Sequence, residues 1–185
     1  LYSSAASDVY KRQSLGYWGM TEAEALALAK KRFKEYVTDG VQAFKGKAPL
    51  RAMVSFDKAL NVALQTKDLK SYIPQLYTYA RESAFSADRY REAETYAKAL
   101  AGMMAREKPD TPEHADALIR LGLVRARMEK YDQAIPVLEE GAEIMANLEL
   151  EAPQIEALTD LGVVLENATD YDRALEQFQS AAALS

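Results

Sequence analysis

Apolar residues recur through most of the chain at the spacing of helices that bury one face. In the segment AEALALAKKRFKEYV, which begins at Ala23, they return every three or four positions, and charged residues fill many of the gaps. A helix of about 3.6 residues per turn places such positions along one side. Nothing in the sequence reads as a strand. The pattern therefore predicts an all-α protein.

Helix start signals divide this pattern into separate helices. Thr21 and Glu24 have the spacing of a capping box, and Asp110 and Glu113 repeat that spacing. Pro112 suits a first helical turn, where its missing N–H would have no partner in any case. The short polar segments DLKS, REKPDT and ELEAP separate one pair of helices from the next. The chain is therefore expected to form a series of short helical hairpins.

A set of small and large residues recurs every 40 or 41 positions. The clearest pair of segments is LGLVRARMEKYDQAIPVL and LGVVLENATDYDRALEQF, which begin at Leu121 and Leu161. Self-similarity at this period predicts stacked helix–turn–helix units, each of which buries the apolar face of its neighbour. We expect four repeats, within residues 21–66, 71–108, 111–149 and 152–185.

Small residues are expected where the two helices of a repeat touch. A glycine precedes an alanine by 12 positions, and a further residue, usually small, follows seven positions after that alanine. Helices approach closely only where side chains are small. Repeat 2 carries Arg81 at the glycine position, so we expect its helices to be splayed, its register to shift towards Ala80 or Ala84, or the Arg81 head to reach water. The signature residues are Gly40, Ala52, Phe56, Ala59, Ala93, Gly122, Ala134, Leu138, Gly162, Ala174, Phe178 and Ala181.

This pattern resembles the tetratricopeptide repeat, in which W-x2-L-G-x2-Y is followed by A-x3-F and a further small residue. The resemblance covers roughly residues 21–185, and the period of 40 to 41 is similar to the longer variant found in kinesin light chains. HEAT and armadillo repeats share the period but lack the glycine and alanine spacing. The resemblance implies a right-handed α-α superhelix, a solenoid of about four helix–turn–helix repeats.

The beginning of the chain is expected to be foreign to the protein. The string SSAASDVYKRQ, residues 3–13, resembles the in-frame translation of a DNA-sequencing adapter. We therefore expect residues 1–13 to be a disordered, non-native tail and residues 14–20 to be a linker remnant. The last helix ends in AAALS without the polar cap of a finished solenoid, so truncation is expected at both ends.

Charge and composition exclude several classes of function. The formal net charge is −5, and no block of lysine and arginine is present, which argues against nucleic-acid binding. No apolar stretch approaches the roughly 20 residues that span a bilayer, so no membrane association is expected. The absence of cysteine excludes disulfides and thiolate zinc sites, and it is weak evidence for the cytoplasm.

The sequence offers no catalytic, metal-binding or cofactor-binding constellation. His114 is the single histidine, and we expect a solvated residue at a helix start because a metal site needs three or four converging ligands. The eight glycines are dispersed and form no phosphate-binding loop. Neighbouring carboxylates such as Glu139 and Glu140 are expected to be solvated. We therefore expect a protein that is not an enzyme.

The resemblance implies that the leading helices line a concave groove that holds a protein or peptide partner. Aromatic and arginine side chains in such a groove would dominate binding. Two residues have structural alternatives: Phe85 as core between hairpins, and Arg120 as an ion-pair partner of Asp116. The groove candidates are Tyr79, Glu82, Phe85, Arg120, Leu123, Arg127, Asp160 and Asn167.

Three functions remain open at this stage. The first is a non-catalytic interaction scaffold that binds a peptide or protein segment. The second is the regulatory arm of a larger multidomain enzyme or signalling protein, whose catalytic part lies outside this sequence. The third is a helical repeat that reads RNA, and the acidic charge argues against it.

Overall fold

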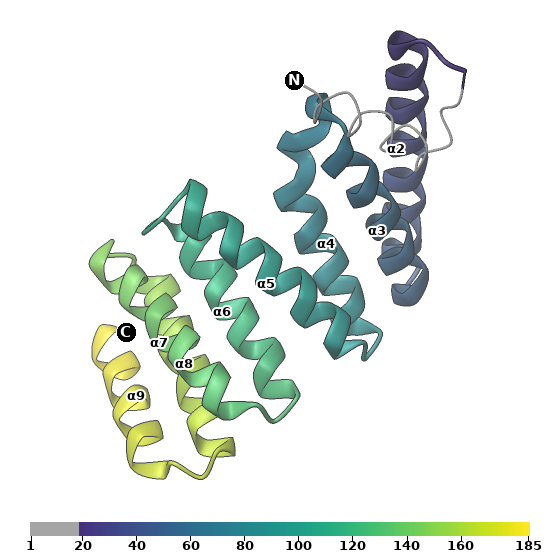
Figure 1. Ribbon diagram of the computed structural model, residues 1–185. Helices are drawn as coiled ribbons and strands as arrows, with labels where there is room; N and C mark the ends of the chain where they lie inside the picture. The colour runs from purple at the N-terminus through teal and green to yellow at the C-terminus, as the bar shows by residue number, and fades with distance from the viewer. Residues whose placement is uncertain (1–18) are drawn as a thin grey trace. The chain divides into compact units, whose positions relative to one another are not determined.

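The computed structural model describes residues 19–185 (Figure 1). The expected tail, residues 1–13, lies outside the described residues, as does most of the expected linker. Within 19–185 the chain forms α-helices and one 3-10 helix, with no strand. The predicted all-α helical repeat fold is confirmed. The elements are α2 (Glu22–Lys45), α3 (Pro49–Gln65), η1 (Lys67–Tyr72), α4 (Ile73–Ser86), α5 (Tyr90–Glu107), α6 (Pro112–Arg127), α7 (Tyr131–Asn147), α8 (Glu151–Asn167) and α9 (Tyr171–Leu184).

The chain divides into two compact units at a point within α4. The first unit extends to Ser83, and its helices α2 and α3 pack along each other as a hairpin. Thr21 and Glu24 form the predicted capping box at the start of α2, where the Thr21 N–H donates to the Glu24 carboxylate at 2.8 Å. Phe56 of α3 is fully buried and stacks on Tyr79 of α4, with ring centroids 5.1 Å apart.

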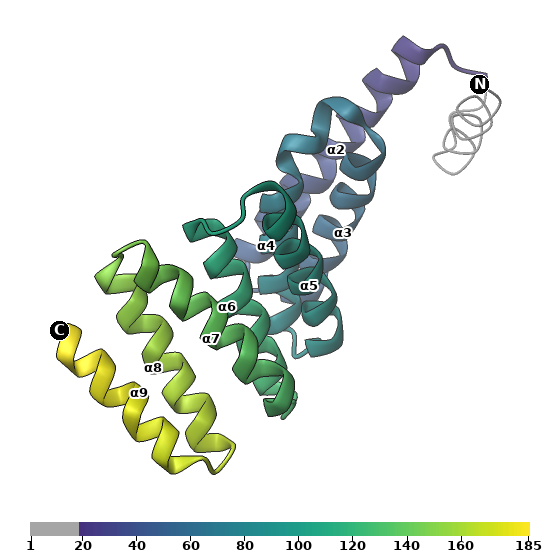
Figure 2. The ribbon, with the colours of Figure 1, turned by 60° about the vertical axis from the view of Figure 1, so that its left-hand side comes forward.

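The second unit, Ala84–Ser185, contains the hairpins α6–α7 and α8–α9, with α5 packed on α6. Helix α7 packs against both α6 and α8, and α8 also contacts α6 directly. Figure 2 shows α6, α7, α8 and α9 following one another in that order. Apolar residues from these helices form the core, among them Leu138, Leu161 and Leu165, each at most 2% exposed. This arrangement is what the repeat requires, because each hairpin covers an apolar face of the next.

Every hairpin turns in the same way. One residue in each hairpin turn has a positive φ, between 55° and 64°, and the four residues are of four different types. In each case the N–H of the residue that follows donates to the carbonyl of the residue five positions before it, as Asp170 donates to Leu165 at 2.9 Å. This is the Schellman ending of an α-helix, whose left-handed position is most often glycine. The four positions are Lys47, Asp88, Glu129 and Thr169.

Repeat 2 therefore turns like the others, although Arg81 stands where the other repeats have glycine. The Arg81 side chain is only 10% exposed, and its guanidinium donates to Glu82 at 3.1 Å. Ala80 and Ala84 on either side are fully buried. Of the three alternatives expected for Arg81, the one in which its head reaches open water is wrong, because the side chain is largely buried and pairs with Glu82.

The start of α6 corrects two further predictions. His114 is 5% exposed and not solvated, and its Nδ1 accepts a hydrogen bond from the Asp110 N–H at 3.3 Å. Asp110 does not cap the helix, since it occupies a turn with φ of 53°. Thr111 is the N-cap, and its hydroxyl accepts from the His114 N–H. The histidine is thus a satisfied structural residue at the helix start.

Candidate functional site

The helices of residues 19–185 include none that is both long and apolar enough to cross a membrane. The same residues contain no group of three or more histidine, cysteine or acidic side chains that could hold a metal ion. The candidates that remain are exposed positions on the helices.

One group of such positions lies on α6 and α8, the first helices of two consecutive repeats. Four positions on each helix are spaced by four, three and four residues, so they follow one side of the helix. The two helices contact each other in the second unit. We call these eight residues the α6–α8 face. They are Asp116, Arg120, Leu123 and Arg127 on α6, and Glu156, Asp160, Val163 and Asn167 on α8.

The α6–α8 face combines exposed polar ends with an apolar middle. Arg120, Arg127 and Asn167 are exposed, and Leu123 is half-buried. Val163 is 44% exposed, a large fraction for a valine in a packed helix. The spacing of Val163 from Asp160 and Asn167 places it on the same side of α8 as these two residues.

Charges on this face are unequally paired. Arg120 Nε donates to Asp116 Oδ1 at 3.1 Å, which confirms the structural alternative for this arginine. Asp160 is half-buried, and burial raises the pKa of its carboxyl. The nearby Arg120 acts in the opposite direction, and Glu156 raises the pKa of Asp160 further. The face therefore carries one carboxyl group whose charge is poorly solvated.

The predicted groove residues of repeat 2 have contacts of their own. Tyr79 stacks on Phe56 and meets Phe44 edge-on, with centroids 6.3 Å apart, so its ring contributes to packing in the first unit. Glu82 accepts from Arg81. These two side chains belong to the first unit, and the α6–α8 face belongs to the second.

Phe85 and Arg127 lie together in the second unit. The Phe85 ring meets Tyr90 edge-on at 5.4 Å, and the Arg127 guanidinium lies 5.6 Å from the Phe85 ring centre. A cation over an aromatic face is attracted by the ring quadrupole. Phe85 is half-buried, so its ring supports Arg127 at the end of the α6–α8 face while keeping part of its own surface open.

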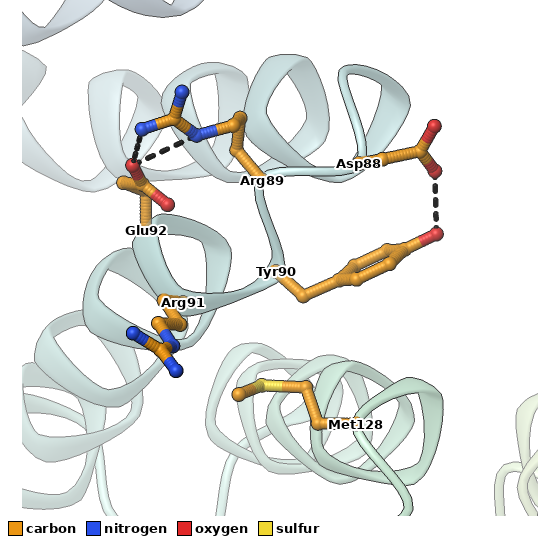
Figure 3. A pocket seen from close by; sticks show the side chains of 6 residues that line it. All are labelled: Asp88, Arg89, Tyr90, Arg91, Glu92 and Met128. Atoms are coloured by element: carbon orange, nitrogen blue, oxygen red, sulfur yellow. Dashed lines mark hydrogen bonds and ion pairs between the residues drawn. The ribbon is translucent and has the colours of Figure 1, made fainter.

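A shallow hollow of about 470 Å³ lies beside the turn before α5 (Figure 3). Tyr90 donates to Asp88 at 2.6 Å, and Arg89 Nε donates to Glu92 at 2.9 Å. Figure 3 shows both pairs along the rim. These side chains are already paired with one another, so the hollow offers few free polar groups.

Sequence reasoning missed one ion-pair network. Glu94 of α5 accepts from Lys130 at 2.7 Å and from Arg125 Nε at 3.1 Å. The Lys130 ammonium holds the pKa of Glu94 below its usual value, with Arg125 acting in the same direction and partial burial opposing both. The network joins repeats 2 and 3. Its residues are 31 and 36 positions apart, so no local spacing rule could have paired them.

Comparison with known proteins identifies the repeat in part of the chain. Residues 113–185 match the family model described as tetratricopeptide repeat. No curated protein matches the chain in sequence.

Several solved structures have a similar fold. MamA is 20% identical with a TM-score of 0.62, over 88% of this chain and 83% of MamA. RapI in its apo form is 14% identical with a TM-score of 0.71, over 98% of this chain and 63% of RapI. The Rap conjugation gene regulator of plasmid pLS20, solved in complex with a Phr peptide, is 13% identical with a TM-score of 0.67, over 92% of this chain and 47% of the regulator. At these identities the likeness shows the fold alone.

Proposed function

We propose that this chain is a non-catalytic scaffold that holds a peptide or protein segment on the α6–α8 face, a proposal supported by the match of residues 113–185 to the tetratricopeptide repeat model. Helical repeats of this kind form extended surfaces for binding other proteins. The partner would lie on α6 and α8, the first helices of repeats 3 and 4, where regularly spaced side chains are exposed or half-buried.

The observation that carries this proposal is the exposed apolar side chain of Val163 between polar neighbours on α8. It is 44% exposed, while Asp160 and Asn167 lie on either side of it along the helix. Binding sites combine a central apolar contact with a polar rim that fixes orientation. Leu123 occupies the equivalent position on α6, so two apolar side chains can contact one ligand.

The similar fold of the pLS20 regulator supports a peptide as the ligand, because that protein was solved with a peptide bound. For this chain the nature of the ligand remains our proposal. Tyr79, Glu82 and Phe85 stay candidates for additional contacts, and the α6–α8 face does not depend on them.

Selection of random displayed peptides on the full chain tests the proposal. We expect a common sequence motif among the selected peptides, and binding should weaken by about tenfold or more when Val163→Glu places a charge in the apolar contact. Leu175→Glu is the matched control, since Leu175 is 57% exposed on α9 and lies outside the face. Failure to select any motif, or equal weakening by both variants, would show that the face is not the binding site.

A further inference from the structure

Repeats 3 and 4 carry opposite charges at one equivalent position of the α6–α8 face. Both helices have an acidic residue at the first position of the face, Asp116 on α6 and Glu156 on α8. One turn later α6 has Arg120, whereas α8 has Asp160 at the position 40 residues further on. The cation that neutralises the acid of α6 is thus replaced by a second acid on α8.

This exchange leaves the α8 carboxylates without a cation of their own. Glu156 and Asp160 are four residues apart on one helix, where like charges repel. Arg120 lies near Asp160, but its Nε is bonded to Asp116 at 3.1 Å. Among the described residues, Asp160 forms no hydrogen bond or ion pair. Arg120 is therefore the cation beside Asp116 and near Asp160, while the other arginine of the face, Arg127, lies over the Phe85 ring.

Solvation does not remove this imbalance. Asp160 is half-buried, and burial is the largest influence on its carboxyl group, raising its pKa. A carboxylate that loses water without gaining a donor is destabilised. A partly buried charge also interacts more strongly with an approaching opposite charge than a fully solvated one does. The site is consequently more favourable for a cation that brings its own hydrogen-bond donors.

We propose that Asp160 anchors an arginine or lysine side chain of the bound peptide, and that an apolar residue of the same peptide contacts Val163 and Leu123. This inference rests on the proposed function and names the chemistry of the partner. The ligand's cation would take the place beside Glu156 and Asp160 that Arg120 takes beside Asp116. Val163 lies three residues after Asp160, so the basic and apolar side chains of the ligand are expected to be neighbours in its sequence.

The first test is the composition of peptides selected from a random library on the full chain. We expect one position enriched in arginine and lysine, next to a position enriched in leucine, isoleucine, valine or aromatic residues. Selection of a motif without a basic position would overturn the anchoring role of Asp160 while leaving the binding face in place. Absence of any motif would remove the proposed function and this inference together.

The second test is a double-mutant cycle with one selected peptide and its variant in which the basic residue is replaced by glutamine. Wild-type protein should bind the glutamine peptide about tenfold more weakly. Asp160→Asn should lose a similar factor towards the basic peptide and should no longer distinguish the two peptides. Independent effects of the two changes would contradict a direct contact.

Two controls accompany the cycle. Glu176→Gln removes an exposed acid of α9 outside the face, so it should leave both affinities unchanged within about twofold. If Glu176→Gln weakened binding of the basic peptide by the same factor as Asp160→Asn, the overall negative charge, and not Asp160, would select the basic peptide. Asp160→Arg, in turn, should favour a peptide with glutamate at the anchor position, and an unchanged preference for the basic peptide would overturn the proposal.

Discussion

Gly122 of α6 lies directly against Leu138 of α7, so closely that a Cβ atom at Gly122 would stand 2.5 Å from Leu138 Cγ. The same relationship holds between Gly40 and the Phe56 ring at 2.7 Å, and between Gly162 and the Phe178 ring at 2.6 Å. In each pair 16 residues separate the glycine from the large side chain. The repeat unit thus brings its two helices together where one residue has no side chain.

Gly122→Ala is expected to destabilise the protein. The added methyl group would also stand 3.1 Å from the Ala134 carbonyl oxygen, and backbone cannot move aside as a flexible side chain can. Overpacking of a close helix crossing costs about 1 to 3 kcal/mol. Thermal or urea unfolding followed by circular dichroism measures the loss.

Gly102→Ala in α5 is the matched control. Its nearest atom would be the tip of Arg106 at 3.5 Å, an ordinary contact. Alanine is the better helix former by about 1 kcal/mol, so this variant should be as stable as the wild type or more so. Equal stability of the two alanine variants would contradict the close crossing at Gly122.

Thr169→Gly is expected to stabilise the protein. Thr169 is exposed and has a φ of 64°, which disfavours a β-branched side chain. Glycine removes that strain, and the greater freedom of the unfolded chain offsets part of the gain, which leaves about 0.5 to 1 kcal/mol. Thr159→Gly, at an exposed helical position of α8, should instead destabilise by about 0.3 kcal/mol, because glycine is a poorer helix former than threonine. A stabilising Thr159 variant, or a destabilising Thr169 variant, would argue against this description of the turn.

The helical fold and its repeat could be predicted because close helix crossings demand small residues, and those residues are visible in the sequence. The turns could not be predicted in the same detail. Lys47, Asp88, Glu129 and Thr169 share a left-handed backbone, but beyond being polar they differ in charge and shape, and none is the glycine typical of this position. Hydrogen bonds of the backbone impose this conformation, so the residue type carries little signal.

Glu94→Gln is expected to destabilise the protein at neutral pH by about 1 to 3 kcal/mol, because the charge-assisted bonds to Lys130 and Arg125 lose their anion. The pKa of Glu94 is lowered in the folded protein, so its contribution to stability is present at neutral pH and is lost as the pH falls through the folded pKa. The difference between variant and wild type should therefore shrink below about pH 4. A difference independent of pH would point to packing and not to charge.

Asp160→Asn is expected to raise stability slightly at pH 7, by no more than about 1 kcal/mol because the group remains partly solvated. Burial raises the pKa of Asp160, so the folded state holds this proton more tightly than the unfolded state. Stability attributable to this group consequently falls as the pH rises through the folded pKa, and the variant should lose its advantage below about pH 4. A less stable variant at pH 7 would mean that Asp160 has a partner in the folded protein. A gain in stability with a loss of binding is the exchange expected of a functional residue.

The candidate site was only partly predictable. The pairing of Arg120 with Asp116 follows from their four-residue spacing on one helix. The half-burial of Asp160 depends on how α6 and α8 lie against each other, which no local pattern contains. The prediction for His114 was wrong for the same kind of reason, since tertiary packing buries a residue that its helix-start position would leave in water.

Mapping a selected peptide onto the protein by amide chemical shifts tests the central claim most directly. We predict that the largest shifts on titration fall on the α6–α8 face, with Leu123, Asp160 and Val163 among them, and that Leu175 of α9 stays unchanged. Shifts concentrated on α9, or spread evenly over all helices, would contradict the assignment of this face as the binding site.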